Sequence, residues 1–143
     1  MFTMSTFDKT AILFPMIALA TLTFAVLMLI PVRRFRAGIA GQVRYDDFRY
    51  GESERVPPEV SIPNRNMMNL LELPLLFYVA CLTYLVIGRV DGVALALAWA
   101  YVGLRAAHSV IHVTYNRVRH RLIAFALSNI VLVSFWTNLI RSF

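Results

Sequence analysis

Polar and charged side chains occur at helical spacing at the start of one of the most apolar parts of the chain. Arg65, Asn69 and Glu72 are spaced so that on an α-helix they share one face within an arc of about 60°. The apolar run that they open continues to Gly88. A charged side chain is costly in hydrocarbon and is usually retained there for a function. The spacing therefore predicts a polar site on a membrane-spanning helix.

A second polar face occurs later, on another apolar segment. Arg105, His108 and His112 also share an arc of about 60° on a helix, and Asn116 extends the same face. Arg121 then begins the last apolar segment. Each set occupies the same half of its segment, so we expect polar faces from three helices to meet at one level of a bundle.

Two interpretations of these faces are open. In the first, Glu72 pairs with Arg105 and Asn69 bridges two helices, which serves packing alone. In the second, the surplus of arginines over the single acid within the spans forms a cationic cavity for an anionic ligand that also carries an amine. A metal site is not expected, because the pair His108 and His112 lacks a third ligand on its face and the nearby arginines would repel a cation.

The elements that must position these side chains are long apolar segments. Apolar residues make up 59% of the chain and charged residues 15%, which lies outside the range of ordinary soluble domains. Four segments reach or approach the roughly 20 residues that a helix needs to cross a membrane. We expect a single all-α domain over residues 1–143, an antiparallel bundle of four transmembrane helices. The predicted spans are 10–43, 64–88, 92–116 and 119–140, with a cytoplasmic loop at 44–63.

The arginines are concentrated in two of the three connections. The chain has a formal net charge of +6. The arginines assigned to the first connection are Arg33, Arg34, Arg36, Arg44, Arg49 and Arg55, and those assigned to the third are Arg117, Arg119 and Arg121. With four spans these connections lie on one side, which the positive-inside rule makes cytoplasmic, with both termini opposite. The arginines lack the interleaved aromatic residues of a nucleic-acid surface, so we expect a lipid bilayer rather than nucleic acid as the partner.

Local signals refine the boundaries of these elements. Pro31 is expected to kink the first helix rather than end it. The long loop contains several prolines, including Pro63, and Asn64 is expected to cap the second helix.

Three motifs cover nearly the whole chain in order. RNMMNLLELP occupies residues 65–74, GQVR residues 41–44, and RAAHSVIHVTYNRVRHR residues 105–121. The first is similar to an R-x-x-x-N-x-x-E-x-x-P-like signature, the second to the end of a first helix, and the third to an R-x-x-H pattern with a downstream arginine. Together they resemble the MAPEG family, the membrane-associated proteins in eicosanoid and glutathione metabolism, and specifically a bacterial-type member.

The resemblance implies a homotrimer in a bacterial inner membrane, with glutathione bound as co-substrate between subunits near the cytoplasmic face. By position, the residues that correspond to glutathione ligands are Arg44, Arg65, Asn69, Glu72, His108 and Arg121. We add Arg105 and His112 from the polar face described above. Arg121 matches the catalytic arginine near the sulfur, where a guanidinium favours thiolate over thiol.

The implied function is that of a glutathione-dependent membrane transferase or peroxidase. Its second substrate would be a lipophilic electrophile or hydroperoxide that enters from the bilayer. The alternative is a non-catalytic lipid-binding or scaffold protein of the same fold.

The chain departs from the family pattern around the matched arginine. In the prostaglandin E synthase branch a serine follows that arginine and a tyrosine lies four residues after it, whereas here these positions are Leu122 and Phe125. His112 stands where a tyrosine is common, and Met68 replaces a second arginine. These changes favour general transferase or peroxidase chemistry over a specialised isomerase. The apolar surroundings of the sulfur also motivate the non-catalytic alternative.

Overall fold

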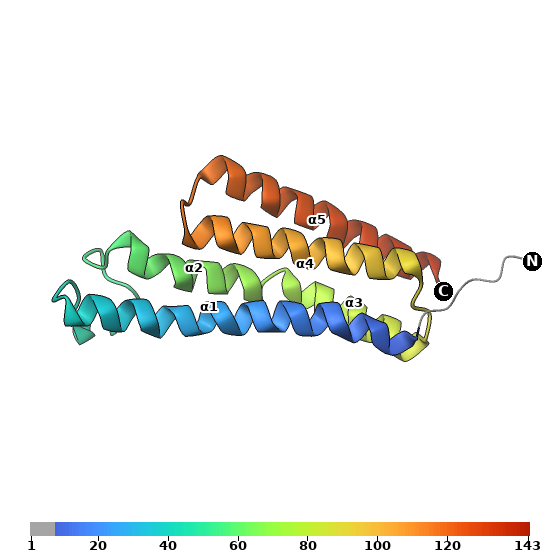
Figure 1. Ribbon diagram of the computed structural model, residues 1–143, viewed down its shortest axis with the longest axis horizontal. Helices are drawn as coiled ribbons and strands as arrows, with labels where there is room; N and C mark the ends of the chain where they lie inside the picture. The colour runs from blue at the N-terminus through green and yellow to red at the C-terminus, as the bar shows by residue number, and fades with distance from the viewer. Residues whose placement is uncertain (1–7) are drawn as a thin grey trace, which may run out of the picture.

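Four helical segments of membrane-spanning length make up the part of the chain that the computed structural model describes, residues 8–143. They are Lys9–Ile39, Pro58–Ile87, Gly92–Val113 and Val118–Arg141. Successive segments run in opposite directions, so the chain enters α1 (Leu13–Ile39) and leaves α5 (Val118–Arg141) at the same end of the bundle (Figure 1). The predicted all-α bundle of four membrane-spanning segments is confirmed.

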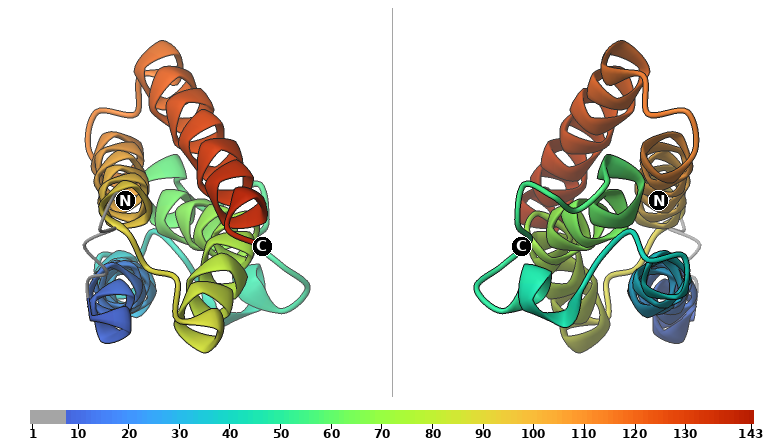
Figure 2. Two further views of the ribbon diagram at one scale, coloured as in Figure 1. Left: turned by 90° about the vertical axis from the view of Figure 1, so that its right-hand side faces the viewer. Right: turned by 90° about the vertical axis from the view of Figure 1, so that its left-hand side faces the viewer.

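Two of the four segments are composite. The first joins the 3-10 helix η1 (Lys9–Ile12) to α1, and the second joins α2 (Pro58–Leu71) to α3 (Pro74–Ile87). The third is α4 (Gly92–Val113), which packs mainly against α5, while α1 packs mainly against α2. Seen along the bundle, α5 is inclined to the other helices (Figure 2). The long loop, which contains the 3-10 helix η2 (Tyr45–Phe48), and the α4–α5 turn lie at one end, which we call the loop end (Figure 1).

Stacked aromatic rings form the core where α3, α4 and α5 meet. Phe77 lies on Tyr101 with ring centroids 4.8 Å apart, and Tyr84 lies on Phe135 at 5.0 Å. All four side chains are fully buried. Lipid tails are as apolar as this core, so close packing rather than exclusion of water holds the helices together. Other large apolar side chains face outward along the spans, among them Phe14, Ile17, Phe24, Met28, Ile130 and Val133.

The first helix is shorter than its predicted span. It continues through Pro31 but ends at Ile39. Gly41 adopts a left-handed conformation with φ of 71°, and the amide of Gln42 donates to the carbonyl of Ala37 at 2.9 Å. A glycine in this conformation stops an α-helix and satisfies its last carbonyls.

The second segment begins earlier than predicted, at Pro58 rather than near Asn64. A proline fits the first turn of a helix, where the missing amide hydrogen is not needed. Pro63, which we expected in the loop, therefore lies inside α2. It cannot donate to the carbonyl of Glu59 four residues earlier. Arg33 supplies the missing donor, because its Nη1 lies 2.7 Å from that carbonyl oxygen.

The same arginine also reaches a third helix. Nη2 of Arg33 donates to the carbonyl of Val113 at 2.7 Å, at the last residue of α4. The final carbonyls of a helix have no partner within it, and a cation is favourable at the negative end of the helix dipole. Arg33 thus joins α1, α2 and α4 near the loop end.

The carboxylate of Asp47 organises the long loop. It accepts hydrogen bonds from the backbone amide of Arg44 at 2.8 Å and from the hydroxyl of Ser53 at 2.9 Å. The Arg44 amide and then the Ser53 hydroxyl hold the pKa of Asp47 below its ordinary value of 3.8. The charged form therefore persists at neutral pH and keeps Arg44 at the start of η2.

The second segment is interrupted between α2 and α3. Pro74 has no amide hydrogen and its ring conflicts with the preceding turn, and Glu72 leaves helical geometry with φ of −81° and ψ of −98°. The interruption separates the carbonyl of Asn69 from its usual helical donor. A guanidinium nitrogen of Arg105 on α4 donates to that carbonyl instead. Arg33 and Arg105 thus each satisfy a carbonyl that a proline-containing helix leaves free.

Candidate functional site

A cavity of about 330 Å³ opens near the loop end between α2, α4 and α5. Three helices that are distant in sequence supply its lining, which consists of Arg65, Asn69, His108, His112, Val118, Arg121, Leu122 and Phe125. Most of the polar residues that the sequence singled out are therefore brought together. Its volume falls at the lower end of the range typical of small-molecule sites.

The cavity is cationic. Arg65 projects into it from α2 and Arg121 from the first turn of α5, whereas no carboxylate lines it within residues 8–143. The amino end of α5 adds the positive end of a helix dipole beside Arg121. This arrangement suits an anion and repels a metal cation.

Two buried histidines form one wall. His108 and His112 lie one turn apart on α4, each is 3% exposed, and their ring centroids are 5.7 Å apart. The Nδ1 atom of each ring has no hydrogen-bond partner among the described residues. Buried polar atoms are nearly always hydrogen-bonded. A polar ligand in the cavity would provide the missing partners.

Arg121 is held by a neighbour in the α4–α5 turn. Its Nη1 donates to the side-chain carbonyl oxygen of Asn116 at 2.9 Å. The other lining residues from α5 are Val118, Leu122 and Phe125, which are apolar. The guanidinium of Arg121 therefore lies against an apolar surface, where its charge is weakly screened.

Arg105 is placed behind the cavity rather than in its lining. Its side chain is fully buried, donates to the carbonyl of Asn69, and has its guanidinium carbon 5.8 Å from the ring centre of Phe125. Both of its neighbours, Asn69 and Phe125, line the cavity. Arg105 thus holds two of the residues that line the cavity, without lining it itself.

Glu72 lies outside the cavity. It is exposed at the interruption between α2 and α3, so it does not continue the helical face of Arg65 and Asn69. The pairing with Arg105 that the packing interpretation expected is not formed as an ion pair, although the charge of Glu72 acts on that guanidinium. The one ion pair within residues 8–143 joins Arg34 to Glu52.

Arg44 lies in a different hollow. A cavity of about 690 Å³ runs along the loop end of α1, and its lining consists of Ile30, Pro31, Arg34, Phe35, Gly38, Ile39, Val43, Arg44, Tyr45 and Phe48. It is larger than the first, but it lacks the histidines and takes its residues from α1 and the following loop only. Within one chain, Arg44 and Arg121 therefore belong to separate cavities.

Sequence reasoning assigned no role to the contact between Asn116 and Arg121. Asn116 follows α4, and asparagine is one of the few residues that tolerate the left-handed conformation found after helix ends. Its place in the α4–α5 turn, shortly before the matched arginine, was the available signal. Sequence reasoning also counted Arg33 only among the arginines of the first connection, whereas it joins three helices.

Fold and cavity define an integral membrane protein of four spans, with a cationic cavity between three of its helices near one end. The model of the MAPEG family matches residues 12–141 of this chain. The chain therefore belongs to the MAPEG family, whose members are membrane proteins of eicosanoid and glutathione metabolism. No curated protein and no solved structure matches it.

Proposed function

We propose that this protein is a glutathione-dependent membrane transferase or peroxidase, with glutathione in the cavity between α2, α4 and α5. The observation that carries the proposal is the position of Arg121, whose guanidinium enters a cavity lined by a second arginine, two buried histidines and no carboxylate within the described residues. Glutathione carries two carboxylates and one ammonium and is anionic overall, which matches this charge.

Each lining residue has a role in this proposal. Arg65 binds a carboxylate of the peptide, and the side-chain amide of Asn69 and the free Nδ1 atoms of His108 and His112 hydrogen-bond its polar groups. Arg121 lies at the sulfur, where its positive charge favours the thiolate. Leu122 and Phe125, next to Arg121, provide the apolar surface that a lipophilic second substrate requires.

Two reactions are open to a thiolate held in this way. With an electrophile, the sulfur forms a carbon–sulfur bond while the leaving group departs with its electron pair. With a hydroperoxide, the sulfur attacks the outer oxygen, the O–O bond breaks and an alcohol is released. A second glutathione then converts the oxidised sulfur to the disulfide, with loss of water. Neither reaction needs a hydroxyl group at Leu122 or Phe125.

The experiment that tests the proposal is a glutathione titration of the detergent-solubilised protein, followed by thiolate absorbance as a function of pH. We expect saturable binding and a thiol pKa about 1–3 units below the ordinary value near 8.5. Saturable binding with an ordinary thiol pKa would reject the role of Arg121. Conjugation of a lipophilic electrophile and reduction of a lipid hydroperoxide are then assayed separately to distinguish the two activities.

The non-catalytic alternative is a lipid-binding or scaffold protein, and the apolar residues Leu122 and Phe125 beside Arg121 favour it. In that case a lipid would occupy the cavity, and glutathione would bind weakly or not at all. The same titration decides between the two, because the alternative predicts no saturable effect of glutathione on the protein.

We further propose that three copies assemble, and that each cavity is completed by a neighbouring subunit. Arg44 lies apart from Arg121 in one chain, so it reaches a glutathione near Arg121 only if a second copy presents its own α1 and long loop to the cavity. Glu72, exposed within the second segment, would likewise gain a partner at such an interface. Native mass spectrometry of the detergent-solubilised protein should give three copies, and a monomer would contradict this proposal.

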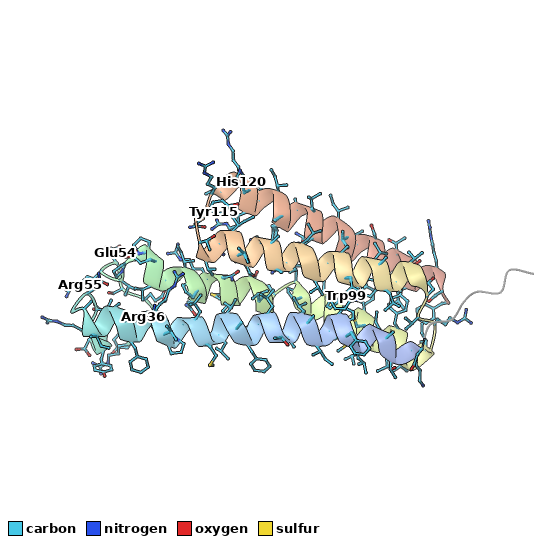
Figure 3. The ribbon with its side chains drawn as sticks, in the orientation of Figure 1. Arg36, Glu54, Arg55, Trp99, Tyr115 and His120 are labelled. Carbon is cyan, nitrogen blue, oxygen red and sulfur yellow. The ribbon has the colours of Figure 1, made fainter. Side chains whose placement is uncertain are left out.

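We place the loop end in the cytoplasm of a bacterial cell and both termini across the inner membrane. Arg36 near the end of α1, Arg55 from the long loop, Tyr115 from the α4–α5 turn and His120 from the first turn of α5 lie at this same end (Figure 3). Such a concentration of arginines is typical of the cytoplasmic side. In an Arg55→Cys variant, the new cysteine should react with a membrane-impermeant thiol reagent only after the cells are opened. Reaction in intact cells would show that the orientation is the opposite one.

A further inference from the structure

We propose that Asn116 is a positioning residue for Arg121. It fixes the guanidinium at the place of the sulfur without reducing its charge. This inference rests on the proposed glutathione function and adds to it a residue on the α4–α5 turn that does not line the cavity.

The backbone of Asn116 ends α4 in an unusual conformation. Its φ is +47°, the one positive value for a residue other than glycine within residues 8–143. Its amide donates to the carbonyl of Ile111 at 2.8 Å, and the amide of Thr114 donates to the carbonyl of Val110 at 3.1 Å. A positive φ of this kind is the left-handed conformation that glycine adopts most readily. Glycine would satisfy this backbone at no steric cost, so the backbone alone does not require asparagine.

The side chain of Asn116 supplies the reason for asparagine. Its carbonyl oxygen accepts a hydrogen bond from Nη1 of Arg121 at 2.9 Å, in a partly buried setting. This is the single hydrogen bond that the Arg121 guanidinium makes within the part of the chain that the structure describes. The remaining N–H groups stay available to a ligand. An arginine side chain loses much rotational freedom when it is held in place, and a prior contact reduces the cost of ordering it on binding.

The hydrogen-bond acceptor for Arg121 must be neutral if the guanidinium is to keep its full effect on a thiolate. An aspartate would accept the same hydrogen bond, but its negative charge would offset the positive charge that stabilises a thiolate. The asparagine amide holds the guanidinium and leaves its full charge directed at the cavity. Asparagine therefore combines three properties here: tolerance of a positive φ, an acceptor oxygen and neutrality.

The test compares Asn116→Gly and Asn116→Asp with the wild-type protein. Glycine keeps the helix ending and removes the acceptor, so we expect an unchanged unfolding midpoint, an increase in the thiol pKa of bound glutathione, and an affinity about two- to tenfold weaker. Aspartate keeps the acceptor and adds a charge, so we expect the thiol pKa to rise by about 1 unit or more. A purely structural role would change the unfolding midpoint and leave the thiol pKa alone.

A second measurement tests positioning without glutathione. The NMR order parameter of the Arg121 Nε–H group should fall in the ligand-free Asn116→Gly protein and remain near the wild-type value in Asn116→Asp. An unchanged order parameter in the glycine variant, or an unchanged thiol pKa in both variants, would overturn the inference. If the wild-type protein itself fails to lower the thiol pKa, the proposed function fails, and the order parameters still decide whether Asn116 positions Arg121.

Discussion

Replacing Arg121 with alanine should raise the thiol pKa of bound glutathione by about 1–3 units, back toward the ordinary value near 8.5, which lowers the thiolate fraction at pH 7 about eightfold to thirtyfold. The reason is that Arg121 is the arginine of the cavity that lies beside the apolar surface of Leu122 and Phe125, where charge is weakly screened. The measurement is thiolate absorbance against pH at saturating glutathione. Turnover with a lipophilic electrophile should fall in parallel.

Arg119→Ala is the matched control for this prediction. Arg119 lies in the same first turn of α5 but is exposed and does not line the cavity. Its replacement should leave the thiol pKa within about 0.2 units of wild type, since an exposed charge is well screened. Arg121→Lys should retain part of the shift, because the charge remains while the fork of donors is lost. Equal effects in the Arg119 and Arg121 variants would show that overall charge, not the cavity, acts on the thiol.

Replacing Arg33 with alanine should destabilise the bundle by about 2–4 kcal/mol, because two charge-assisted hydrogen bonds are lost together. The carbonyl of Glu59 has no helical donor because residue 63 is a proline, and the carbonyl of Val113 belongs to the last residue of α4. Both would remain without a protein donor. The measurement is the thermal unfolding midpoint in detergent at a fixed heating rate, which we expect to fall by roughly 5–15 °C.

Arg36→Ala is the control for this second prediction. Arg36 lies near the end of the same helix but is exposed, and its side chain makes no hydrogen bond within the described part of the chain. Its replacement should change the midpoint by less than about 2 °C. Arg33→Lys should lie between the two, because an ammonium cannot reach both carbonyls with the geometry of a guanidinium. An unfolding midpoint unaffected by Arg33→Ala would show that the two carbonyls find other donors.

The candidate site was predictable to the extent that helical periodicity controls it. The spacing of His108 and His112 indicates that both share a face with Arg105, but it does not say which member reaches a cavity. The structure places the two histidines in the lining and Arg105 behind it, bonded to the carbonyl of Asn69. Periodicity defines a direction around one helix and contains no information on its rotation against a neighbour. Side-chain burial in a bundle depends on that rotation.

Prolines limited the same reasoning. The face of Arg65 and Asn69 could be extended to Glu72 only on an uninterrupted helix, and Pro74 interrupts it, so Glu72 lies outside the cavity. Pro63 was taken as a loop residue, although a proline within α2 is accommodated because Arg33 satisfies the carbonyl that it leaves free. In both cases an arginine from another helix satisfies the carbonyl that the proline-containing segment leaves free. Local rules for proline do not include such distant donors.

Composition and order along the chain were sufficient for the architecture. Four long apolar segments require four spans, because a helix that crosses a bilayer must satisfy its backbone internally and present apolar side chains to lipid. Motif spacing was sufficient for the family. Only the tertiary structure decided that Arg121 is held by Asn116, that Arg33 joins three helices, and that Arg44 and Arg121 lie in separate cavities of one chain. These contacts depend on where packed helices bring distant carbonyls and guanidinium groups together, which no periodicity within a single segment specifies.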